Sequence, residues 1–153
     1  MMKKGLLGVT LLLVANLASA SLVVTLPAHG LTDPCQNIVG AWSGSGVVTA
    51  EIIGMPINCT YHGEGQVPSI SSSGEISMNI QLTKESGFCP DGDEFTLRGT
   101  CRDGRLSLDV TNASLQGTLS ADGRSADMSG TVGVDVLGQY IIANVESMHL
   151  TKK

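Results

Sequence analysis

The 153-residue chain is acidic, with 14 Asp and Glu against 9 Lys and Arg, and 42% of its residues are hydrophobic. That hydrophobic share is enough to bury a core, which excludes a disordered chain. Nucleic acid and anionic lipid are excluded as expected partners, because both need a basic protein surface.

The N-terminal segment has the pattern of an export signal. Lys3 and Lys4 precede an apolar run over residues 6–17 that ends in Ala18-Ser19-Ala20. A charged start, an apolar middle and an A-x-A exit are typical of a secretory signal peptide. We therefore expect a signal peptide at 1–20, an extended lead-in at 21–34 and the folded domain at 35–153.

Two alternatives remain for this segment. Cleavage could fall after Gly30, or the segment could stay as an uncleaved anchor, because its apolar character continues to Leu26. With cleavage we expect no membrane span, and the expected location is the bacterial periplasm or the outside of the cell.

Beyond the lead-in, apolar and polar residues alternate and turn signals recur at short intervals. This pattern is typical of many short β-strands. Asp103-Gly104 and Asp122-Gly123 are residue pairs that two-residue hairpin turns prefer. Eight strands are expected, at residues 38–53, 57–67, 76–82, 95–101, 106–110, 115–119, 126–136 and 140–152.

The short connections predict an antiparallel meander, because parallel pairs need long crossovers. A flat eight-stranded meander would leave its apolar face in water and two edges unpaired. Closure removes both problems, and eight strands enclose an interior that side chains can fill. We therefore expect an all-β, eight-stranded antiparallel up-and-down barrel, with a two-sheet sandwich as the alternative.

Four cysteines in an exported chain predict two disulfides. The connections of a meander alternate between its two ends, here named the floor, where the first strand begins, and the mouth. Cys35 and Cys101 fall at the floor, whereas Cys59 and Cys89 fall near the mouth. We therefore expect the pairs Cys35–Cys101 and Cys59–Cys89. A Cys89–Cys101 pair is disfavoured, because the strand between them would span about 20 Å.

The G-x-W stretch that ends at Trp42, with Cys35 just upstream, resembles the first strand of the calycin superfamily, which contains the lipocalins and avidins. This resemblance implies that Trp42 packs across the barrel floor. It also implies a basic side chain from the end of the barrel beside the indole, a position for Lys152 or Lys153. In avidins a Cys before G-x-W forms a disulfide, which is similar to the expected Cys35–Cys101. The cage of several Trp residues with which avidins hold biotin is not matched.

Candidate metal and catalytic groups are few. Asp91, Asp93 and Glu94 form a compact acidic loop that could offer oxygen ligands to Ca²⁺, although a solvated turn is the simpler interpretation. The three histidines share no metal-ligand spacing. Paired carboxylates, or a nucleophile beside a base, are not evident. We therefore expect a non-enzymatic protein without a cofactor.

The inward faces of the expected strands hold the remaining candidates. A packed core is the simpler interpretation of these faces. The alternative is an apolar pocket open at the mouth, with tyrosines as polar anchors. Its candidate ligand-binding residues are Tyr61, Met78, Phe95, Leu97, Met128 and Tyr140.

Three functions follow as hypotheses. The first is an exported binding protein for a small apolar ligand inside the barrel. The second is an inhibitor of an exported enzyme, such as a lysozyme or a protease, that acts through mouth loops at 87–94 and 111–114 and suits a basic partner. The third is a structural envelope protein without a ligand.

Overall fold

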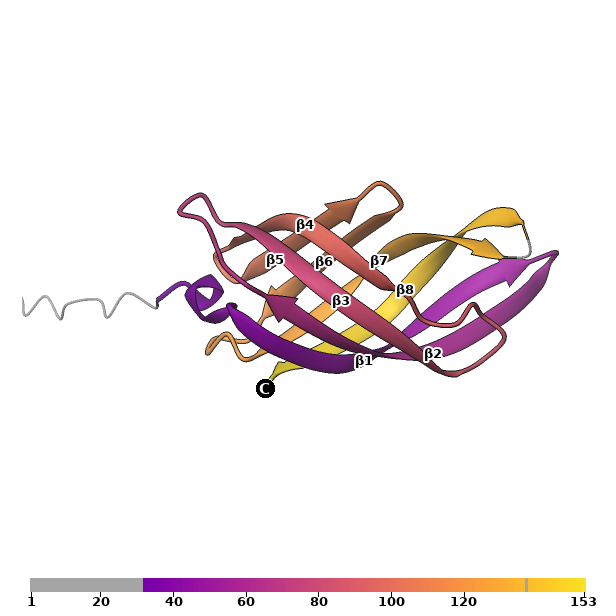
Figure 1. Cartoon of the computed structure of the whole chain (residues 1–153), viewed down its shortest axis with the longest axis horizontal. Coiled ribbons are helices and arrows are strands. Elements are labelled where there is room, and N and C mark those ends of the chain that lie inside the picture. The colour runs from indigo at the N-terminus through magenta and orange to yellow at the C-terminus, as the bar shows by residue number, and fades with distance from the viewer. Residues whose placement is uncertain (1–31, 137) are drawn as a thin grey trace, which may run out of the picture. The chain divides into compact units, whose positions relative to one another are not determined.

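The computed structural model describes residues 32–136 and 138–153, so the expected signal peptide and most of the lead-in lie outside the described residues. The described chain forms a closed barrel of eight antiparallel strands in sequence order, with the first strand paired to the last (Figure 1). The expected fold class is therefore confirmed. The strands are β1 (Gly40–Ile52), β2 (Met55–Val67), β3 (Glu75–Ser86), β4 (Glu94–Arg102), β5 (Arg105–Val110), β6 (Ala113–Leu119), β7 (Ser125–Val136) and β8 (Gln139–Lys152).

The closing pair of strands contains one irregularity. A β-bulge at Glu146 in β8 shifts the register against both β1 and β7. The extra residue changes the alternation of the strand, because two residues of β8 then oppose one residue of its neighbour. As a result, Val145 and Met148 both face the interior although they are three residues apart.

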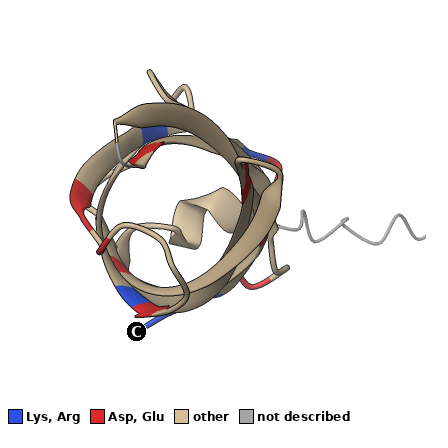
Figure 2. Cartoon of the chain, turned by 90° about the vertical axis from the view of Figure 1, so that its right-hand side faces the viewer, with Lys and Arg blue, Asp and Glu red and all other residues tan. Residues whose placement is uncertain are grey.

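A short 3-10 helix, η1 (Pro34–Asn37), precedes β1 and lies across the floor, as Figure 2 shows in a view along the barrel. Trp42, at the start of β1, is buried, and its Nε1–H donates to the Ile38 carbonyl oxygen at 2.7 Å. Lys152 pairs with Trp42 across β1 and β8, and its Nζ donates to the Asn37 carbonyl oxygen at 2.6 Å. The indole and a lysine of the last strand thus each donate to a backbone carbonyl oxygen at the end of η1 or just after it.

Asp33 ties η1 to the β4–β5 hairpin. Its carboxylate accepts hydrogen bonds from the backbone N–H groups of Cys35, Asp103 and Gly104 at 3.0–3.1 Å. The bond from Cys35 is the main cause that lowers the pKa of the Asp33 carboxyl, and the two hairpin N–H groups add to it. The disulfide Cys35–Cys101 joins the same two segments. It confirms one expected pair, and Cys59–Cys89 confirms the other.

The packed core occupies the floor half of the barrel. The largest buried side chains of this core are Trp42, Ile38, Leu97, Leu108 and Val67, and a few of its members, such as Ile80 and Leu115, reach the cavity described below. The interior of the mouth half includes small side chains such as Ala50 and Ala143, and it leaves a space in which a ligand could lie.

Candidate ligand-binding cavity

The mouth half of the barrel encloses a cavity of about 620 Å³. Ligand pockets in proteins usually measure about 300–1,000 Å³, so the cavity is large enough for a small molecule. Trp42, Met78 and Leu150 line its floor side. Its walls are mostly apolar and come from strands on all sides, with Val48, Ala50, Ile57, Ile80, Val110, Leu115, Val132, Val134, Ile141 and Ala143 among them.

Small residues keep this space open. Ala50 and Ala143 face the interior where a larger side chain would fill it. Gly44 lets β1 and β8 come together, because a Cβ there would lie 1.9 Å from the His149 carbonyl oxygen. Protein interiors otherwise pack as densely as organic crystals, so a cavity of this size is unusual for a barrel whose only role is structural.

The β3–β4 connection, residues 87–93 and named here the mouth loop, forms part of the cavity wall. The Cys59–Cys89 disulfide anchors it to β2, and the Tyr61 hydroxyl donates to the Pro90 carbonyl oxygen at 2.8 Å. Lys84 Nζ donates to the Cys89 carbonyl oxygen at 2.7 Å. The Leu82 N–H donates to the Asp93 carbonyl oxygen at 2.9 Å, which holds the end of the loop against β3.

The charged residues in the described lining of the cavity are all acidic. Its acidic residues are Glu64, Asp91, Asp93 and Asp135, of which Glu64 and Asp135 lie at outward positions of β2 and β7, and among the described residues the lining contains no Lys, Arg or His. Glu64 forms an ion pair with Lys153 at 2.5 Å, and the hydrogen bond in this pair lowers the pKa of its carboxyl. Burial raises the pKa of the Tyr61 phenol, and the charge of Asp91 raises it further.

This arrangement suits a molecule with an apolar body and a neutral or cationic polar end. An anionic end would find no cation among the described residues of the lining and would lie near the carboxylates of Asp91 and Asp93 in the mouth loop. The Tyr61 phenol stays protonated at neutral pH, so it can act as a hydrogen-bond donor or acceptor.

The sequence-derived candidates divide into three groups. Tyr61, Met78 and Phe95 line the cavity. Leu97 and Met128 are buried in the packed core and are absent from the cavity lining. Tyr140 also does not line the cavity: it is exposed, and its hydroxyl lies over Gly133.

Several cavity residues were not candidates. The mouth loop and the small inward residues Ala50 and Ala143 belong to the lining. The signal for the small residues was present in the sequence, because Ala and Gly recur at inward positions of the first two and last two strands. The inward fold of the mouth loop had no such signal.

The acidic residues of the mouth loop do not assemble as ligands. Asp91 is paired with Lys84 at 2.9 Å, and Asp93 Oδ1 accepts from the Glu94 N–H at 2.8 Å. Across residues 32–136 and 138–153, no group of three or more His, Cys, Asp or Glu could hold a metal ion. Within the same residues no helix has the length and apolar character to span a membrane.

No family model matches the chain, and no curated protein matches it. Among solved structures, an S-type phycobiliprotein lyase from Guillardia theta is similar in fold, with 9% sequence identity and a TM-score of 0.41 over 78% of this chain and 90% of that chain. The closed eight-stranded barrel itself fits a calycin-like architecture.

One expectation needs correction. The sequence was interpreted as that of a non-enzymatic protein, and the comparison contradicts this, because the similar structure is that of a lyase. A TM-score of 0.41 is no basis for assigning the activity of the lyase to this chain.

The two disulfides indicate an oxidising compartment outside the cytoplasm. Both cross-link segments that are distant in sequence, with separations of 66 and 30 residues.

Proposed function

We propose that this protein binds a small apolar ligand in the mouth half of its barrel, and that it does so in the periplasm or outside a bacterial cell. On this proposal the barrel is a member of the calycin superfamily, to which the stretch around Trp42 is similar. The observation that carries the proposal is the cavity of about 620 Å³ with apolar walls.

An empty cavity lowers the stability of a folded protein. A cavity forfeits the dispersion contacts that a filled core would make, and the loss of stability grows with the volume left empty. Strands β1, β2, β7 and β8 nevertheless place small residues around this space, and the floor half is well packed. An apolar ligand would restore those contacts, and its own removal from water would contribute to binding.

The contacts at the mouth suit such a ligand. Tyr61 and the mouth loop lie at the rim of the cavity, where the polar end of a bound molecule would meet water. The disulfide at Cys89 holds the loop in place, so little order has to be gained on binding.

Two adjacent valines of β1 provide a matched test. Val48 lines the cavity, whereas its neighbour Val47 is partly exposed on the outer face. We expect wild type to bind the apolar dye N-phenyl-1-naphthylamine in a 1:1 complex, as followed by dye fluorescence. Val48→Trp places an indole in the cavity and should weaken binding about tenfold or more, by about 1.4 kcal/mol or more.

The control is Val47→Trp, which adds the same side chain outside the barrel and should leave the dye affinity unchanged. Failure of wild type to bind the dye, or equal loss of binding in both variants, would contradict the proposal.

A further inference from the structure

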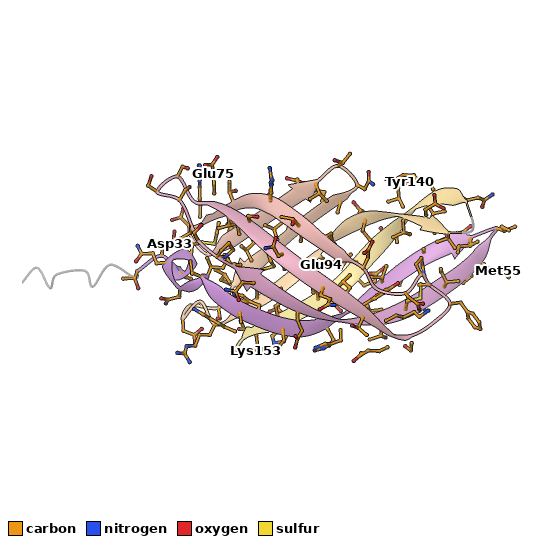
Figure 3. All side chains as sticks on the ribbon, in the orientation of Figure 1. Asp33, Met55, Glu75, Glu94, Tyr140 and Lys153 are labelled. Atoms are coloured by element: carbon orange, nitrogen blue, oxygen red, sulfur yellow. A yellow bond between two sulfur atoms is a disulfide. The ribbon has the colours of Figure 1, made fainter. Side chains whose placement is uncertain are left out.

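Large apolar side chains are concentrated at one end of the barrel surface. They come from the β1–β2 hairpin, the mouth loop and the first residues of β8, and all three segments lie at the mouth (Figure 1). We name this set the apolar rim; its members and exposed fractions are Ile53 84%, Met55 63%, Phe88 94%, Tyr140 60% and Ile142 66%. Figure 3 shows Met55 and Tyr140 at the end opposite Asp33 and Lys153. The other exposed large hydrophobics of the described residues, Val39 and Val47, reach only 37%.

The residue at the hairpin tip is unfavourable for the fold in two ways. Ile53 has a φ of 50°, a left-handed conformation that a β-branched residue rarely adopts. Its side chain is also among the most exposed apolar groups of the protein, so it gains nothing from burial. The barrel itself therefore does not explain an isoleucine at this position, and a contact outside the barrel would.

We propose that the apolar rim inserts into the surface of a lipid membrane. The rim consists of exposed side chains from three separate segments, the β1–β2 hairpin, the mouth loop and the first residues of β8. A soft apolar layer can accept several such side chains at once, whereas a protein partner would need a matching pocket for each. Insertion would remove the exposed apolar groups from water.

The charges near the rim select the kind of membrane. Glu51 lies two residues before Ile53, Glu85 and Asp91 lie three residues on either side of Phe88, and Asp135 pairs with Tyr140 across β7 and β8. In the described strand ends and connections at the mouth, Lys84 is the only Lys or Arg, and it is paired with Asp91. These carboxylates would be repelled by an anionic surface, whereas the ammonium groups of a zwitterionic surface complement them. We therefore assign a zwitterionic membrane.

The rim surrounds the end at which the cavity lies. The mouth loop carries Phe88 and also supplies cavity wall through Cys89 to Asp93. A barrel docked by this end would let an apolar molecule pass between membrane and cavity without crossing water. The inference itself stands on the exposed rim, so ligand-free protein can test it, and its failure would leave the binding proposal intact.

Flotation with lipid vesicles tests the inference. The exported protein, in the form that its cells release, is mixed with phosphatidylcholine vesicles or with vesicles of equal parts phosphatidylcholine and phosphatidylglycerol. We expect wild type to float with the first and less with the second. The double change Ile53→Asn with Phe88→Ser should lower the partition coefficient by about tenfold or more. The variants share one N-terminus, so any contribution from it cancels.

Two controls separate docking from misfolding. Val47→Asn removes an apolar group from the barrel wall and should leave flotation unchanged. Ile53→Asn alone should raise the thermal midpoint while it lowers flotation, which a folding defect would not do.

Four results would overturn the inference. The first is wild type that does not float with phosphatidylcholine vesicles, and the second is a double variant that floats as wild type does. The third is stronger flotation with the anionic vesicles. The fourth is a wild-type dimer, seen in sedimentation, that Ile53→Asn dissociates. The last result would assign the rim to a second copy of this chain. If the rim instead bound another protein and not vesicles, wild type would not float with phosphatidylcholine vesicles, which is the first of these results.

Discussion

Ile53 and Asp103 occupy the same left-handed position in tight turns at opposite ends of the barrel, with φ values of 50° and 51°. A glycine with positive φ follows each of them, Gly54 at 73° and Gly104 at 72°. Aspartate tolerates this conformation because its short polar side chain can hydrogen-bond locally, whereas isoleucine has a branched Cβ next to the backbone. The floor turn therefore has the residue that the backbone favours, and the mouth turn does not.

The first prediction follows from this pair. Ile53→Asn should raise the free energy of unfolding by about 1 kcal/mol, because asparagine relieves the strain at positive φ. Asp103→Ile should lower it by at least as much, about 1–2 kcal/mol. Urea unfolding followed by the fluorescence of the single Trp measures both. Loss of stability in Ile53→Asn would show that the isoleucine makes a contact within the fold.

The second prediction concerns the floor. Trp42→Ala should lower the free energy of unfolding by about 3–5 kcal/mol, because it removes a large buried side chain. Trp42→Phe should lower the free energy of unfolding by less, about 1–3 kcal/mol, because it keeps an aromatic ring but leaves the Ile38 carbonyl oxygen without its hydrogen-bond donor. Far-ultraviolet circular dichroism measures both without the indole. Unchanged stability in Trp42→Ala would contradict the role of the indole in closing the floor.

The third prediction concerns pH. The pKa of the Asp33 carboxyl is lowered in the folded state, so its stabilising effect is present above the unfolded-state pKa of about 4 and is lost as pH falls through the folded-state value. Asp33→Asn should therefore be less stable than wild type at pH 7, and the difference should shrink as the pH falls below about 4. Thermal midpoints across this range measure it. A constant difference at all pH values would mean that the carboxylate charge is not involved.

The fourth prediction concerns the mouth loop. Replacement of both Cys59 and Cys89 by Ser should lower the free energy of unfolding by about 2–4 kcal/mol. It should also speed the hydrogen exchange of the Leu82 amide, whose acceptor is the Asp93 carbonyl oxygen at the end of the loop. The matched control removes Cys35–Cys101 at the floor, which should leave local opening at Leu82 unchanged. Equal acceleration in both variants would argue against a loop held by its own disulfide.

The fifth prediction concerns the charge of the ligand. Among the residues that the structure describes, the cavity lining holds carboxylates and no Lys, Arg or His, so dodecylammonium should bind more tightly than dodecanoate, which has a tail of similar length. The preference should weaken as salt is added, because the carboxylates near the mouth are solvent-exposed. Competition with the apolar dye measures it. Tighter binding of dodecanoate would contradict the electrostatic account while leaving an apolar site in place.

The barrel was predictable because its signals are local. Alternation marks each strand, the Asp-Gly turns are explicit, and short connections require an antiparallel order. The disulfides followed from one further step, since the connections of a meander alternate between two ends. No long-range information was needed to place Cys35 near Cys101 or Cys59 near Cys89.

The cavity was less predictable, because the alternation of apolar and polar residues shows which side chains face inward but not how far each lies between floor and mouth. Phe95 and Leu97 both face inward from β4, yet only Phe95 lines the cavity, because Leu97 lies nearer the floor where the core is filled. That distinction depends on the tilt and stagger of all eight strands. The inward position of the mouth loop depends on contacts such as the one between Tyr61 and Pro90, which join residues 29 positions apart.

Tyr140 illustrates a different limit. It pairs with Asp135 near the start of β8 and belongs to the outward set, beyond the bulge at Glu146 that changes the alternation of this strand. A bulge shifts the face of each residue on one side of it, and the sequence around Glu146 carries no Gly or Pro to mark the position.

Native mass spectrometry of the protein isolated from the cells that make it tests the binding of an apolar molecule most directly. The account predicts one small molecule per chain, released by organic solvent, and loss of that molecule in Val48→Trp. The account would be contradicted if the spectrum showed only the mass of the disulfide-bonded polypeptide and the wild-type protein also failed to bind apolar probes.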